Sequence, residues 1–242
     1  MKKILNVPEK QLPIKPLTRD ELEEDIKKRL SVITEEFTKG LQILKDHPSS
    51  VTFFGSSFVK EGGEYYEKAK GLASRVVKEL NYSIVTGGGP GIMEAANRGA
   101  YEAGGISVGL NIKLLEEQTT NPYVAEEAAF YYFFIRKVCL SFSAEAYIFF
   151  PGGFGTMDEM FEILTLVQTK KIKPVPIVLF GKAYWDKWET LFKEEILKRG
   201  MIDEEDMSLY TITDSQDDVI SLIKSTPVQS GVPYNTNRKN SL

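Results

Sequence analysis

Short apolar segments alternate with helical segments along most of this chain, and this alternation restricts the fold more than any other feature of the sequence. The apolar segments are VTFFG (51–55), YSIVTGGG (82–89), ISVGLN (106–111), FYYFF (130–134), AYIFFPGG (146–153), VPIVLF (175–180) and LYTIT (209–213). Helical periodicity separates most of them, for example from Glu64, through Met93 and from Thr156. Nearly continuous apolar strands that alternate with helices predict a parallel sheet with helices on both faces, the doubly wound α/β class.

An amphipathic helix is expected before the first of these strands, over residues 18–45. Its apolar residues recur at steps of four and three, at Leu22, Ile26, Leu30, Ile33, Phe37 and Leu41. We therefore expect an N-terminal arm and helix over 1–48, one Rossmann-like domain over 49–226 and a flexible tail over 227–242. The apolar stripe of the helix must cover either the domain or a second subunit.

Composition restricts the partners. A chain of 242 residues with 42% hydrophobic residues supports one well-filled domain. Its net charge of -4 and pI near 5.3 give no general attraction to nucleic acid, so a small molecule is the expected partner. The longest apolar run, AAFYYFFI, is too short to span a bilayer, and the single cysteine excludes an internal disulfide. These features favour a soluble cytoplasmic protein.

Three of the expected strands end in small residues, at loops that lead into helices. The loops are Gly55-Ser56-Ser57, Gly87-Gly88-Gly89-Pro90-Gly91 and Pro151-Gly152-Gly153-Phe154-Gly155-Thr156. Ligands of open α/β sheets bind beyond the carboxyl ends of the strands. Glycine lets a ligand approach the main chain, and the following helix offers unpaired N–H groups. One such turn is common in any α/β fold, but two loops with consecutive glycines predict an anion pocket suited to a phosphate.

The glycine spacing argues against two familiar nucleotide motifs. A dinucleotide G-x-G-x-x-G fingerprint fails because its sixth position is Ile92 when counted from Gly87 and Asp158 when counted from Gly153. A Walker loop fails because Pro176 stands where the first glycine before Gly181-Lys182 is required. A mononucleotide is the phosphate compound that remains.

Charged residues stand close to these loops. The segment TMDE (156–159) matches a capping box, in which the Glu159 carboxylate returns to the backbone at the start of its helix. The same carboxylate can instead point into the crevice, and of the two neighbouring acids we choose Glu159 as the one that faces the site. Asp158 is about 100° round the helix from Glu159 and should not share its target. Arg136 and Lys137 are expected to open a helix after FYYFF, where a nearby anion would offset their conflict with the helix dipole.

The sequence resembles the LONELY GUY (LOG) family, whose members were long labelled as lysine decarboxylases. The resemblance is carried by PGGFGTMDE (151–159), by GGGPGIMEAAN (87–97), by FGSS (54–57) and by Arg136-Lys137 upstream of Pro151. It covers about residues 50–224. The helix at 18–45 is a departure from the shortest members of that family.

The resemblance implies a Rossmann-like fold, a homodimer or a multiple of one, and no cofactor. It also implies hydrolysis of nucleoside 5′-monophosphates, including cytokinin nucleotides, to free base and ribose 5-phosphate. By this similarity Glu159 and Arg136 match the catalytic residues. The residues expected to bind the substrate are Gly55, Ser56, Ser57, Gly87, Gly88, Gly89, Met93, Lys137, Gly152, Gly153, Gly155 and Thr156.

Other functions are weighed against this one. The same pocket could bind a nucleotide without cleaving it, as a carrier or sensor does, and fold alone does not decide between them. No lysine is marked as the Schiff-base residue of a pyridoxal enzyme. His47, the only histidine, is expected in a turn, and Cys139 in the core. Without clustered cysteine or histidine, no metal site is expected.

Overall fold

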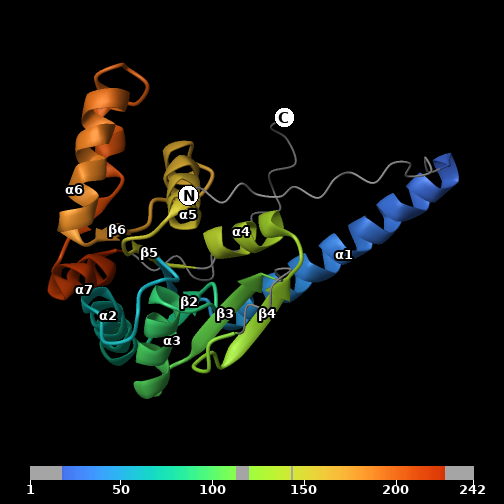
Figure 1. The fold of residues 1–242 in the computed structure, drawn as a ribbon, viewed down its shortest axis with the longest axis horizontal. Coiled ribbons are helices and arrows are strands. Elements are labelled where there is room, and N and C mark those ends of the chain that lie inside the picture. Colours follow the sequence, from blue (N-terminus) through green and yellow to red (C-terminus); the bar gives the residue numbers. More distant parts are fainter. Residues whose placement is uncertain (1–17, 113–119, 143, 227–242) are drawn as a thin grey trace, which may run out of the picture. The chain divides into compact units, whose positions relative to one another are not determined.

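The computed structural model describes residues 18–112, 120–142 and 144–226, and its centre is a parallel sheet of seven strands (Figure 1). The strands are β1 (Ser50–Phe54), β2 (Ser83–Thr86), β3 (Ser107–Ile112), β4 (Glu126–Phe130), β5 (Ala146–Phe149), β6 (Ile177–Phe180) and β7 (Thr211–Thr213). Their order across the sheet is β4-β3-β2-β1-β5-β6-β7. The doubly wound α/β class predicted from the sequence is therefore confirmed.

The helices are α1 (Arg19–Asp46), α2 (Glu64–Leu80), α3 (Ile92–Glu102), α4 (Phe133–Ser141), α5 (Phe154–Gln168), α6 (Lys182–Leu191) and α7 (Gln216–Ser225). A π-helical segment, Phe192–Leu197, continues α6, and a 3-10 helix spans Glu204–Ser208. Figure 1 shows α2, α3 and α7 on one face of the sheet and α4, α5 and α6 on the other. The expected arm over 1–17 and tail over 227–242 lie outside the described residues.

Burial along the strands follows their place in the sheet. Every residue of β1, β2, β5 and β6 is buried, as expected for parallel strands covered on both faces. Alternate residues face opposite sides, so Val51 and Phe53 enter the core beneath α2 and α3. The edge strand β4 is different, because only Ala128 and Phe130 are buried there. Its polar composition suits an edge that lacks one neighbour.

The prediction of a strand at FYYFF (130–134) is wrong. The strand ends at Phe130, and α4 already begins at Phe133. The buried carboxylate of Glu36 on α1 accepts hydrogen bonds from the backbone N–H groups of Tyr131 (2.7 Å) and Tyr132 (3.3 Å). These amides are therefore bound to a side chain at the point where the aromatic run turns from strand to helix.

The chain divides into two compact units, and the boundary between them lies within α1, between Glu35 and Glu36. The helix begins with a capping box, in which Thr18 N donates to the Glu21 carboxylate at 2.7 Å and Glu21 N donates to the Thr18 hydroxyl at 3.3 Å. In the second unit, His47 Nε2 lies 2.9 Å from the Glu126 carboxylate of β4. The division expected at residue 48 stays a proposal.

Among the described residues, no helix is both long and apolar enough to cross a bilayer.

The contact between α2 and α3 at Gly99 provides a test of their packing. A Cβ at Gly99 of α3 would overlap the Lys70 carbonyl oxygen and lie 3.1 Å from Ala73 Cβ. We expect Gly99→Ala to lower the free energy of unfolding by about 2 kcal/mol, because the backbone of α2 must move. Urea unfolding followed by circular dichroism measures this change.

Gly71 of α2 provides the matched control. A Cβ there would meet only the amide end of Gln216, at 3.3 Å. We expect Gly71→Ala to leave stability unchanged or raise it by about 0.5 kcal/mol, since alanine is the better helix former. Equal losses in the two variants would contradict this account of the helix contact.

Candidate active site

The strand order reverses between β1 and β5, and the loops that follow these strands meet at that point. In an open parallel sheet this reversal leaves a crevice, because the chain leaves the two strands in opposite directions. Backbone hydrogen bonds fix the loops to one another. Ser56 N donates to the Pro151 carbonyl at 3.0 Å, and Ile92 N donates to the Ser56 carbonyl at 3.1 Å. The loops after β1, β2 and β5 therefore form one connected frame.

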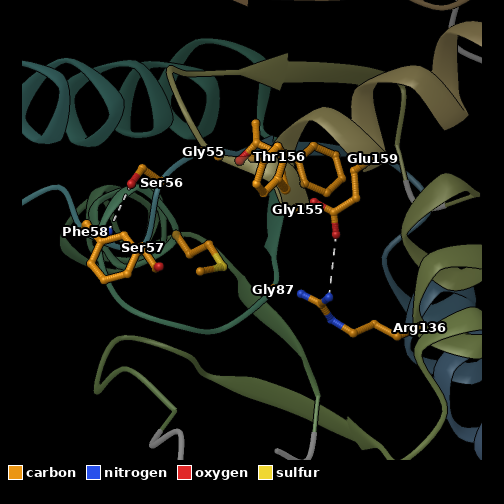
Figure 2. A pocket seen from close by; sticks show the side chains of 13 residues that line it. Gly55, Ser56, Ser57, Phe58, Gly87, Arg136, Gly155, Thr156 and Glu159 are labelled. Atoms are coloured by element: carbon orange, nitrogen blue, oxygen red, sulfur yellow. Dashed lines mark hydrogen bonds and ion pairs between the residues drawn. The ribbon is translucent and has the colours of Figure 1, made fainter. Parts of the chain in front are cut away.

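A cavity of about 290 Å³ lies within this frame (Figure 2). Its lining residues are Phe54, Gly55, Ser56, Ser57, Phe58, Gly87, Met93, Arg136, Gly153, Phe154, Gly155, Thr156 and Glu159. The first turn of α5 reaches the cavity at Phe154, Gly155 and Thr156. The first amides of a helix have no intrahelical carbonyl to bind and carry the positive end of the helix dipole, so this wall of the cavity favours an anion.

Arg136 and Glu159 bring opposite charges into the cavity from different helices. Arg136 on α4 donates from Nε to the Leu110 carbonyl of β3 at 2.7 Å. One of its terminal nitrogens lies 3.5 Å from a Glu159 carboxylate oxygen, and the side chains are only 11% and 15% exposed. The bond to Leu110 fixes the guanidinium plane. The remaining N–H groups of Arg136 extend toward Glu159 (Figure 2).

Burial shifts the pKa of both groups. It raises the pKa of Glu159 to about 7, because loss of solvent outweighs the attraction of Arg136. Burial likewise lowers the pKa of Arg136, against the opposing effect of Glu159. An arginine still keeps its proton at neutral pH. A carboxyl group that titrates near neutrality in a cavity is a physical mark of a functional site.

The glycine at position 87 is required by Arg136. A Cβ there would overlap the guanidinium of Arg136 and lie 2.8 Å from the Met93 sulfur. The arginine thus crosses directly over the backbone that follows β2.

A buried amide network holds the rest of the loop after β2. Asn97 of α3 accepts hydrogen bonds from the Thr86 hydroxyl at 2.6 Å and from the Asn121 amide at 2.9 Å. The Thr86 oxygen accepts from Gly88 N at 2.9 Å, and the Asn121 amide donates to the carbonyls of Gly88 at 3.1 Å and Gly89 at 3.0 Å. Two asparagines therefore fix the polar groups of the glycine loop in a buried region.

Some expected binding residues do not line the cavity. Gly88 and Gly89 turn their carbonyls toward Asn121. The Gly152 carbonyl accepts a hydrogen bond from the Tyr184 hydroxyl at 2.7 Å. Lys137 pairs with Asp158 at 2.8 Å and with Glu162 at 3.4 Å, which places its ammonium on the outer side of α5. Their roles in binding stay predictions.

Of the two roles open to Glu159, the capping box with Thr156 does not form. The N-cap of the helix is Gly153, three residues before Thr156, so Thr156 already lies within the first turn. Glu159 is consequently one turn too far along the helix to bond the backbone at its start. The carboxylate of Glu159 therefore takes the other role and faces the crevice.

Arg136 and Lys137 do not open their helix either. The structure begins α4 at Phe133, so Arg136 is its fourth residue. The expected conflict with the helix dipole falls off within the first turn and is small at this position. The error followed from the misplaced FYYFF strand.

Sequence reasoning missed several contributors to the site. Phe54, Phe58 and Phe154 line the cavity, although none of them was among the expected binding residues. Phe58 and Phe154 carried a usable signal, because a large apolar residue is unexpected in a glycine-rich loop. Asn97 ends the GGGPGIMEAAN segment without any sign of its role, and Asn121 carried no signal, since their partners are each other, backbone groups and small hydroxyls. Among the described residues, no group of His, Cys, Asp and Glu gathers as a metal site.

The fold and the cavity together define a Rossmann-like α/β protein with a buried arginine and glutamate in its switch-point crevice. Within this class, the chain belongs to the family described as "possible lysine decarboxylase", the LOG family, whose model matches residues 93–223. The match confirms the resemblance drawn from the glycine motifs.

Curated relatives carry the name of one activity. LOG5 of Arabidopsis thaliana, a cytokinin riboside 5′-monophosphate phosphoribohydrolase, is 23% identical over 194 residues, which are 79% of this chain and 85% of the relative. The protein of the same activity from Rhodococcoides fascians is 28% identical over 123 residues, 49% of this chain and 61% of the relative. By these names the relatives are hydrolases.

Solved structures share the fold at low identity. The crystal structure of TM1055 has a TM-score of 0.57 at 20% identity and covers 74% of this chain and 99% of that chain. The molybdenum cofactor binding protein from Rippkaea orientalis has a TM-score of 0.52 at 21% identity, with 73% and 94% covered. At such identities the likeness concerns the fold alone.

The raised pKa of Glu159 makes the stability of the fold depend on pH. Between about pH 4.5 and about pH 7, the folded protein keeps a proton on Glu159 that the unfolded chain has lost. The contribution of this group is therefore fully present below pH 4.5 and is lost as the pH rises through 7, by up to about 3 kcal/mol.

Glu159→Gln removes this titration. We expect the difference in unfolding free energy, wild type minus variant, to decrease steadily across this pH window. Urea unfolding of both proteins at a series of pH values measures it. A constant difference would show that the Glu159 carboxyl titrates alike in the folded and unfolded chains.

Proposed function

We propose that this protein hydrolyses the N-glycosidic bond of nucleoside 5′-monophosphates, such as AMP or a cytokinin riboside monophosphate, to free base and ribose 5-phosphate. The observation that carries the proposal is the Glu159 carboxyl group, with its pKa raised to about 7, beside Arg136 at the start of α5. The names of the curated relatives support the same reaction.

The cavity offers groups suited to each part of this substrate. The phosphate would bind the first amides of α5 and the Thr156 hydroxyl, where the helix dipole favours negative charge. Arg136 would donate from its terminal nitrogens to oxygens of the phosphate or the sugar, with its plane held by Leu110. The anomeric carbon would then lie beside Glu159.

Cleavage of the bond develops positive charge on the sugar. The ionised carboxylate of Glu159 would stabilise this oxocarbenium-like transition state and orient the attacking water. The bond between C1′ and the base breaks with its electron pair on the base. Overall, the hydroxyl of water goes to C1′ and its proton to the base. Because stabilisation requires the ionised form, a pKa near neutrality places the switch between inactive and active protein near pH 7.

Assembly into a homo-oligomer is part of this proposal. A homodimer or larger homo-oligomer stays a prediction. The exposed rings of Tyr131, Phe133 and Phe134 at the start of α4 support a contact between copies there.

Glu159→Gln tests the reaction. We expect release of adenine from AMP to fall by about 10²–10³-fold, since the neutral amide cannot stabilise the charged sugar. A chromatographic assay for free adenine measures the rate. The matched control is Asp158→Asn, one residue away on the same helix but 60% exposed and paired with Lys137, for which we expect at most a few-fold change.

The wild-type rate provides a second criterion. We expect kcat/KM to rise with pH through about 7 as Glu159 ionises. Full activity of Glu159→Gln would refute the proposed role. Tight binding of AMP to the wild type without release of adenine would instead assign the protein as a nucleotide carrier.

A further inference from the structure

Two phenylalanine rings at the cavity are almost entirely exposed. Phe58, on the loop after β1, is 91% exposed, and Phe154, the first residue of α5, is 96% exposed. Among the exposed large hydrophobic residues in the described part of the chain, the next is Met201 at 69%. The two largest exposures therefore belong to residues that line the same cavity.

The fold does not use these rings for its own packing. A side chain that stays in water contributes little hydrophobic stabilisation, and single exposed apolar residues are common. Two in one cavity form a surface that a ligand can cover.

Both rings stand on ordered backbone. Phe58 N donates to the Ser56 hydroxyl at 3.1 Å, which closes a tight turn after β1. Phe154 follows the helix N-cap Gly153 directly. Figure 2 shows Phe58 on the side of the cavity opposite Glu159. The backbone at both rings is thus set before a ligand arrives, which lowers the entropy lost on binding.

The chemistry of the cavity indicates which part of the ligand the rings bind. Arg136, Glu159 and the amides of α5 provide charge and hydrogen bonds, which suit a phosphate and a sugar. A phenyl ring provides neither. Its face attracts a flat π-system, and aromatic stacking on a nucleobase does not depend on the identity of the base.

We propose that Phe58 and Phe154 form the base-binding surface of this site and hold the flat heteroaromatic base of the nucleotide by stacking. This inference rests on the proposed function for the choice of ligand. It adds that the base is recognised by apolar contact that does not depend on its identity. AMP and other purine nucleotides should therefore bind with similar affinity. Ribose 5-phosphate, which has no base, binds more weakly.

Binding measurements test the proposal without any need for turnover. Calorimetric titration in the Glu159→Gln background keeps AMP intact, and ribose 5-phosphate serves as the ligand without a base. We expect Phe58→Ala and Phe154→Ala each to raise the Kd for AMP by about tenfold, the effect expected for loss of one stacking partner. The Kd for ribose 5-phosphate stays within twofold of its value in the background protein.

Two further variants separate stacking from bulk. Phe154→Tyr keeps the ring and should retain AMP affinity, whereas Phe154→Leu keeps apolar volume and should lose it. Phe142→Ala is the control for loss of an exposed phenylalanine, because Phe142 is 59% exposed and does not line the cavity.

Several results would overturn the inference. Equal affinity for AMP and ribose 5-phosphate would show that the base makes no contact, even if the wild type hydrolyses AMP. An equal loss of both ligands in the alanine variants would show a general structural role. A change in mass by light scattering would identify the rings as subunit contacts. Conversely, if the wild type binds AMP with the expected ring dependence but releases no adenine, the proposed function fails and this inference stands.

Discussion

The reversal of strand order between β1 and β5 is the constraint on which the rest of the site depends. Successive strands add toward β4 on one side and toward β7 on the other, so the chain leaves β1 and β5 in opposite directions. The loops that follow the two strands are joined across the gap between these exits by the Ser56 N–H and the Pro151 carbonyl. Arg136, Glu159 and the glycine backbone converge because each belongs to an element that ends or crosses at this gap.

Much of the fold could be predicted because its signals are local. Apolar strand segments and the periodicity of the helices are visible within windows of a few residues, and parallel pairing follows from their alternation. The run FYYFF was misread because aromatic residues suit both a strand and the start of a helix. The deciding interaction is the Glu36 carboxylate, which binds the amides of Tyr131 and Tyr132 from a distant part of the chain.

The site was predictable only in part, for a related reason. The glycine loops and Glu159 are marked by residue type and spacing, so their positions could be proposed from the sequence. The start of α5 could not be placed, because Gly155 reads as loop although it is helical. The orientation of Arg136 depends on the Leu110 carbonyl, and the loop after β2 depends on Asn97 and Asn121. The contacts of backbone acceptors and of these asparagines leave no pattern in a sequence.

The carboxylate of Glu36 also affects how this protein meets other chains. β4 is an outer strand of the sheet, and outer strands can recruit foreign strands through their free amides and carbonyls. By binding the two amides directly after β4, Glu36 stops the strand at Phe130 and turns the chain into α4. The acidic side chains of Glu126 and Glu127 add charge at the beginning of the same short strand. The buried Glu36 on α1 thus limits the length of the β4 edge to which a strand of another molecule could pair.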